Sequence, residues 1–252
     1  MRITLLCSRC IDENRDELAK FYSASVREDG LYRLTCERGH QSDLFLIDQK
    51  YVVLFEIALH AIIDGYYRDA VASATSSLER FYEFATRVML HHAGVASPRI
   101  EDSWKIVSKR SEQQLGMFVA AHTFHFGHLP QILSATRVTE RNQVIHNGEI
   151  PSEEKAKGYL AEISKIIGET IINLKETAAS SLASIVSDSV KKVANVNFCT
   201  LPSHLSPTTS SAIFRNATIE SRLEDIDARR AAVKSTNLKS RKSAIIANLP
   251  FE

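Results

Sequence analysis

Apolar and polar residues follow two different rhythms along the chain, and the rhythm changes near residue 51. Before that point, short apolar runs at 3–6, 31–35 and 44–47 are separated by turn residues, which is typical of short strands. After it, apolar residues recur every three or four positions over long stretches, which is typical of helices that bury one face. The pattern therefore predicts a mainly α chain with a small β region at its N-terminus.

The helical stretch divides into several segments. We expect helices over 51–65, 67–92 and 104–126, because each stretch keeps an apolar face or is apolar all round. A shorter helix covers 134–146, and a long one follows Ser152 and weakens toward residue 185. These segments predict an all-α bundle.

Proline, glycine and serine mark the ends of the last two helices. Pro130 fits the first turn of the short helix, where its missing N–H costs nothing. Gly148 fits the left-handed residue that stops it. Ser152 fits the N-cap of the long helix, with acidic residues in the turn that follows.

Composition shifts divide the chain into three parts. We expect a small N-terminal module over 1–48, a helical bundle over 51–193 and a C-terminal extension over 194–252. The extension contains a Ser/Thr/Pro-rich loop over 197–211, a strand near 196–199, a charged helix over 218–233 and a basic tail over 239–242.

The overall charge gives no sign of a particular partner. The formal net charge is +1, with 44% hydrophobic and 24% charged residues. A nucleic-acid contact would therefore need a local basic patch, not a bulk field. No apolar run approaches the roughly 20 residues of a membrane helix, and the N-terminus lacks the apolar region of a signal peptide. We expect a cytoplasmic protein that does not enter a membrane.

The N-terminal module has the residues of a metal site. Cys7 and Cys10 form a C-x2-C pair, and Cys36 and His40 stand at a turn between two predicted strands. Three thiolates and one imidazole suit tetrahedral zinc and leave no open position, so the site would be structural. The arrangement resembles a zinc ribbon, with an insertion over 11–30 that can hold one helix around 17–22. The alternatives are that Cys199 replaces His40, or that the cysteines are ordinary core residues without metal.

The short helix over 134–146 carries the candidate chemistry. On an ideal helix, Arg141 and Asn142 share the stripe of Val138 and Ile145, and His146 borders it. A guanidinium on an apolar stripe needs an anionic partner or a lined cavity. One interpretation is an ordinary amphipathic helix whose arginine pairs with a carboxylate; the other is a site that binds phosphate and moves a proton.

The pattern Arg-Asn-x-x-x-His late in a helix, after two long helices, resembles the HEPN superfamily. The likeness extends over 51–189, and the stretches 65–71 and 77–82 also resemble the early helices of that family. It implies a HEPN-like helical bundle, and many such proteins are metal-independent endoribonucleases of toxin–antitoxin, abortive-infection and CRISPR-linked defence systems. A toxin subfamily carries a tyrosine at the position of Gly148, so the modification made there is not expected here.

The resemblance implies catalytic roles for Arg141, Asn142 and His146. RNA supplies its own nucleophile, the 2′-hydroxyl, so cleavage needs proton transfer, for which His146 is suited near neutral pH. Arg141 would stabilise the charge on the phosphorane, and Asn142 would hold the imidazole or a phosphate oxygen. Arg141 and His146 lie about 140° apart on an ideal helix, so we expect a homodimer that places two sets of side chains around a shared cleft.

Other functions stay open at this stage. The main alternative is a non-catalytic module that binds protein or nucleic acid, and a weaker one is a nucleic-acid-binding regulator built on the ribbon. An antitoxin or sensor protein is a further expected partner. His122, His125 and His128 also suggest a metal site, but histidines at a helix end beside aromatic residues are the commoner explanation, and one of them can line the cleft.

Overall fold

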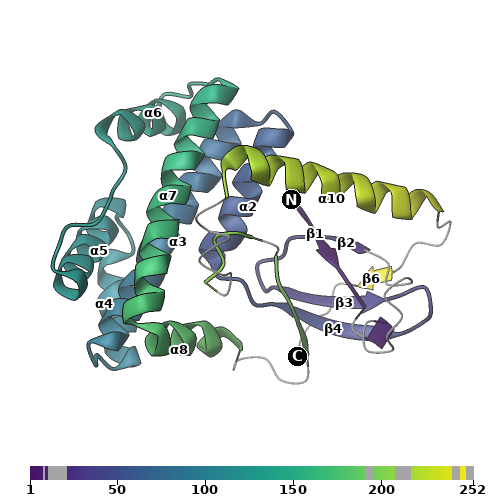
Figure 1. Cartoon of the computed structure of the whole chain (residues 1–252), viewed down its shortest axis with the longest axis horizontal. Coiled ribbons are helices and arrows are strands. Elements are labelled where there is room, and N and C mark those ends of the chain that lie inside the picture. The colour runs from purple at the N-terminus through teal and green to yellow at the C-terminus, as the bar shows by residue number, and fades with distance from the viewer. Residues whose placement is uncertain are drawn as a thin grey trace. The chain divides into compact units, whose positions relative to one another are not determined.

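The computed structural model describes residues 1–7, 9–10, 22–190, 196–201, 203–207, 217–239 and 245–247 (Figure 1). The chain forms two compact units. Unit 1 contains Met1–Asp48, Ser189–Pro202 and Leu223–Glu252, and unit 2 contains Gln49–Asp188 and Ser203–Arg222. The described residues are mainly helical with a small β region, as the hydrophobic pattern predicts.

Unit 1 is built on two small sheets. Strands β1 (Arg2–Leu5) and β2 (Tyr22–Ser25) pair antiparallel. In the second sheet, β3 (Leu31–Thr35) and β4 (Gln41–Leu46) form the predicted hairpin, with Tyr32 and Leu34 buried on one strand and Leu44 and Leu46 on the other. This alternation buries one face of the hairpin and leaves the other partly exposed, with Arg33 and Asp43 paired across it.

Residues from the C-terminal part of the sequence complete that second sheet. β5 (Asn197–Cys199) lies parallel to β4, and β6 (Ile245–Ala247) lies antiparallel to β3. Strand β5 matches the strand predicted near 196–199. The helix predicted at 17–22 lies outside the described residues except for Tyr22, which opens β2, and the basic tail lies outside them beyond residue 239.

Unit 2 is a helical bundle arranged around one long helix. α3 (Tyr67–His92) contacts α2 (Lys50–Ile63), α4 (Ser97–Val107), α5 (Ser111–Phe126), α6 (Ala135–His146) and α7 (Glu153–Thr177). Figure 1 shows α3 and α7 running alongside each other. The core between them is apolar and aromatic, with Tyr51, Phe55, Phe81, Phe118 and Tyr159 buried. α8 (Ala179–Val190) follows α7, and the residues of α10 (Ile219–Lys239) divide between the two units.

Three predicted helix boundaries are wrong. The helix expected over 104–126 is two helices, because Arg110 has extended φ and ψ angles and the Gln114 amide satisfies the free carbonyl of Ser108 at 2.7 Å. Pro130 precedes the short helix, which begins at Ala135. The long helix breaks at Ala178, whose φ of −138° is not helical, and α8 follows.

Candidate functional site

The helix that carries the motif, α6, ends at Gly148 as predicted but begins at Ala135, after a serine cap, and not with Pro130 in its first turn. Ser134 is the N-cap, and its hydroxyl accepts a hydrogen bond from the Arg137 N–H. At the other end Gly148 has a φ of +73°, and the Glu149 N–H bonds back to the Gln143 carbonyl. A left-handed residue after the last turn is favourable only for glycine. Local sequence therefore sets both ends of this helix.

The buried face of α6 differs from the predicted stripe. Val144 is fully buried, and Val138 and Ile145 are half-buried. Arg141 is half-buried, whereas Asn142 and His146 are exposed. The side of α6 that faces the bundle is thus centred nearer Arg141 and Val144 than Val138. The prediction that Asn142 shares the inner stripe is wrong, because amphipathic periodicity alone located that stripe about a quarter-turn away.

Two arginines one turn apart on α6 have different surroundings. Arg137 donates from Nη1 to Glu140 at 2.7 Å, and its Nε lies 3.6 Å from a Glu162 oxygen. Arg141 has a buried Nε without a hydrogen-bond partner in the described part of the chain. A buried donor that lacks an acceptor costs about 1–3 kcal/mol. Among the described residues Arg141 Nε therefore lacks the acceptor that Arg137 has in Glu140.

The Arg141 guanidinium lies near polar groups of α3 and α7. Glu79, Tyr82 and Tyr159 each interact electrostatically with it. Burial raises the pKa of Glu79, and the attraction of Arg80 and Arg141 only partly opposes that effect. Burial likewise raises the pKa of Tyr159 to about 12, against a 2.9 Å hydrogen bond with Thr75. Tyr82 and Tyr159 are buried and Glu79 is half-buried, so Arg141 interacts with polar groups of the bundle and not only with solvent.

Glu79 is the residue among these polar groups that sequence reasoning missed. It recurs with Thr75 and Tyr82 at positions i, i+4 and i+7 of α3, which places the three on one polar stripe of a largely apolar helix. That spacing was the available signal. Within one chain the structure brings Glu79 to the side of Arg141, but it leaves His146 exposed on another side of α6.

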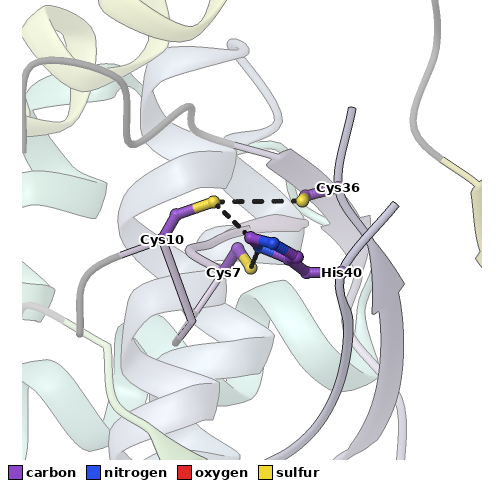
Figure 2. A group of neighbouring side chains, drawn as sticks. All are labelled: Cys7, Cys10, Cys36 and His40. Carbon is purple, nitrogen blue, oxygen red and sulfur yellow. Dashed lines mark hydrogen bonds between the residues drawn. The ribbon is translucent and has the colours of Figure 1, made fainter. Parts of the chain in front are cut away.

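The four predicted metal ligands converge in unit 1. The cysteines are buried, His40 is half-buried, and the ligand atoms lie within 4.8 Å of one another. Figure 2 shows the His40 ring turned toward the sulfurs of Cys7 and Cys10, with the Cys36 sulfur facing that of Cys10. Among the described residues no other group of three or more His, Cys, Asp or Glu side chains is close enough to hold a metal ion.

The distances match a tetrahedral ion. Cys10 Sγ lies 3.9 Å from Cys36 Sγ and 3.5 Å from His40 Nδ1, and Cys7 Sγ lies 3.9 Å from that nitrogen. A tetrahedron with zinc–sulfur bonds of about 2.3 Å and zinc–nitrogen bonds of about 2.05 Å has edges of about 3.8 and 3.6 Å. These three edges therefore have about the length that such an ion requires, and the remaining ligand atoms lie within 4.8 Å of one another.

The electrostatics of the thiols also suit a bound cation. Burial opposes ionisation of Cys7, but hydrogen bonds from the Cys10 backbone and the Ser42 hydroxyl lower its pKa to about 7. Burial, with the neighbouring sulfurs of Cys7 and Cys36, raises the pKa of Cys10 to about 12. One thiolate thus disfavours the next. A bound cation removes this conflict, since it stabilises all three thiolates together.

The histidines at the end of α5 have partners in the protein. His122 is buried and lies 3.1 Å from the His128 carbonyl, and His125 lies 2.9 Å from the Thr177 hydroxyl. The His122 ring also lies 4.5 Å from that of Phe126. Burial lowers the pKa of both His122 and His125. This agrees with the interpretation of histidines beside aromatic residues at a helix end.

Comparisons with known proteins gave no relative: no family model, no curated protein and no solved structure matches the chain. In the part of the chain that the structure describes, no helix combines the length and apolar character that crossing a membrane requires.

Proposed function

We propose that this protein is a metal-independent endoribonuclease of the HEPN type. The observation that carries the proposal is the contrast on α6 between Arg137, which is paired, and Arg141, whose buried Nε has no acceptor. A buried donor without an acceptor calls for a partner, and the Nε atoms of Arg87 and Arg222 are in the same state on arginines that form ion pairs with carboxylates. A phosphate oxygen is the acceptor that a guanidinium fork matches best.

The reaction divides between two side chains. His146 is exposed and can take the proton from a 2′-hydroxyl or give one to the leaving 5′-oxygen. Arg141 stabilises the negative charge that develops on the phosphorane, and it cannot lose its own proton. Asn142 is exposed beside them and supplies an amide for the imidazole or the phosphate. The proposed chemistry uses only these side chains and the 2′-hydroxyl.

A homodimer completes the proposed site. Arg141 faces the α3 and α7 side of its helix, and His146 is exposed on another side. Since one chain does not enclose a phosphate between the two, we propose that two copies of α6 meet so that the arginine of one serves the histidine of the other. This arrangement follows the resemblance to HEPN nucleases. It predicts that removing either the Arg141 or the His146 side chain abolishes cleavage without dissociating the dimer.

Zinc is the metal that the N-terminal cluster fits. Cys7, Cys10, Cys36 and His40 are the residues that would hold it, and their edge lengths match a tetrahedral site. With four protein ligands the ion would stabilise unit 1 and take no part in cleavage. We propose that unit 1 is a zinc-ribbon-like docking or RNA-contact module.

The biological role that we propose is that of a toxin or abortive-infection effector in bacterial antiviral defence, acting in the cytoplasm. An antitoxin or sensor protein would then restrain or trigger the cleavage, and unit 1 is the part of the chain suited to bind it. These roles rest on the resemblance of the α6 motif to HEPN effectors.

The direct test compares wild type with His146→Ala on total RNA, with and without a chelator. We expect wild type to cut in both conditions and His146→Ala to be inactive. The matched control is His92→Ala, which removes another exposed histidine, at the end of α3. If His146→Ala cuts like wild type, the proposed nuclease is wrong. If no variant cuts but all bind RNA or protein, the chain is a binding module instead.

A further inference from the structure

The helix α6 is held to the bundle by little apolar contact. Among its residues Val144 alone is fully buried, and the segments before and after it are not helical. Burial of one valine contributes about 1.5–3 kcal/mol. A helix of twelve residues is marginal by itself in water. Something other than the apolar core must therefore fix the rotation of α6 about its own axis.

A polar clamp from α7 holds the first turn of α6. Glu162 accepts hydrogen bonds from the backbone N–H of Ser134 at 2.6 Å and from its hydroxyl at 3.2 Å. The second of these Glu162 oxygens lies 3.6 Å from Arg137 Nε. A carboxylate at a helix N-terminus also interacts favourably with the helix dipole. Glu162 of α7 therefore contacts both the N-cap residue Ser134 and the Arg137 side chain of α6.

Gly158, one turn before Glu162 on α7, makes room for the clamp. A Cβ atom added there would lie 3.2 Å from Arg137 Cζ and even closer to one of its terminal nitrogens. The Arg137 guanidinium therefore rests directly on the helix backbone at this point. Glycine in a helix interior costs about 0.5–1 kcal/mol relative to alanine. The atoms that a Cβ would meet are the far end of the flexible Arg137 side chain, so an alanine here would displace that guanidinium and not the helix backbone.

We infer that Arg137, Glu162 and Gly158 are positioning residues that set the rotation of α6 and thereby aim Arg141 and His146. This inference rests on the proposed function, whose site lies on the same helix. Arg141 follows Arg137 by one turn, so a rotation that releases Arg137 displaces Arg141 as well. A misplacement of about 1 Å can cost about 100-fold in rate.

The test compares Gly158→Ala and Glu162→Gln with Gly116→Ala. Gly116 is a helical glycine of α5 with no atom within 4 Å of an added Cβ. Both Gly→Ala changes gain the same helix propensity, so a difference between them reports the clamp. The measurements are kcat and KM for RNA cleavage, and hydrogen exchange of the amides of α6 and α5 in the full chain.

We expect Gly158→Ala and Glu162→Gln to lower kcat by about 10- to 100-fold with KM within about threefold. Exchange should become faster in α6 and stay unchanged in α5, and Gly116→Ala should match wild type. In an Arg137→Met background, Gly158→Ala should have no further effect on kcat or exchange, because the clash is gone.

The inference is overturned if both clamp variants keep the kcat of wild type, whether or not α6 exchange changes. If wild type itself does not cleave RNA, the proposed nuclease falls, and α6 exchange alone decides whether the clamp positions the helix. If Gly158→Ala does not fold, Glu162→Gln gives the same decision, because it adds no volume.

Discussion

The two arginines of α6 should respond in opposite ways to the same substitution. We replace Arg137 or Arg141 with methionine, which keeps most of the aliphatic stem and removes the charge and the donors. Arg137→Met removes a stabilising clamp, whereas Arg141→Met removes a donor that the folded chain leaves unpaired. The first substitution should therefore destabilise unit 2, and the second should not.

The magnitudes follow from exposure and pairing. The side chains of Arg137, Glu140 and Glu162 are 24%, 27% and 28% exposed. A hydrogen bond to a charged group contributes about 1.5–3 kcal/mol when buried, and an exposed ion pair about 0–1 kcal/mol, so Arg137→Met should cost about 1–2 kcal/mol. Arg141→Met relieves a buried unpaired donor, worth about 1–3 kcal/mol before lost solvation contacts are counted. Its net effect should lie between zero and a gain of about 2 kcal/mol.

The assay uses the single tryptophan of the chain. Trp104 is buried in α4 of unit 2, so its fluorescence reports the unfolding of that unit alone. At about 2–4 °C per kcal/mol for a unit of this size, Arg137→Met should lower the melting temperature by about 2–8 °C. Arg141→Met should leave it unchanged or raise it. The same samples are tested for RNA cleavage, which Arg141→Met should abolish.

One result would refute this reasoning. If Arg141→Met lowers the melting temperature as much as Arg137→Met and still cleaves RNA, then Arg141 is a structural residue. The expected result, in which Arg141→Met loses activity without losing stability, is typical of a side chain that serves function at the expense of the fold.

Two further substitutions test the remaining groups. Cys36→Ser should abolish binding of one zinc ion per chain in native mass spectrometry and remove hydrogen-exchange protection from β3 and β4, while the Trp104 unfolding transition stays. The control Cys199→Ser changes the cysteine outside the cluster and should keep the ion. A Cys36→Ser chain with intact protection would contradict a metal-dependent unit 1. Glu79→Gln should be more stable than wild type near neutral pH, because burial raises the pKa of Glu79 and its charge therefore costs stability above that pKa. This difference in stability should vanish as the pH falls through the raised pKa of Glu79 and below the usual value of 4.5. It is measured from the urea midpoints of Trp104 fluorescence. A stability difference that does not change with pH would show that ionisation of Glu79 is not the cause.

Sequence patterns were most reliable where a local cause sets the structure. The end of α6 at Gly148, the cap at Ser152 and the boundaries of α3 are as predicted, because capping and periodicity act over a few residues. The helix breaks at Arg110 and Ala178 carried no proline or glycine. The carbonyl of Ser108 is satisfied by the Gln114 side chain, a contact across the break that no local rule contains.

The metal cluster shows how much ligand spacing alone can establish. The residue types and the C-x2-C pair identified Cys7, Cys10, Cys36 and His40, since few other groupings of side chains suit a tetrahedral ion. The spacing did not show that strands β5 and β6, from far along the chain, complete the sheet that presents Cys36 and His40. Strand pairing between distant segments depends on chain topology, which periodicity does not encode.

The sequence by itself determined the helical class, the four Cys and His side chains that converge in unit 1, and the presence of an arginine and a histidine on one short helix. Only the tertiary structure decided which arginine forms ion pairs and which has a buried Nε without an acceptor, because Arg137 and Arg141 are chemically identical and one turn apart. The difference comes from α7 and α3, which place Glu162 and Gly158 against the first and Glu79 near the second. Contacts between distant residues give the same side chain two different roles.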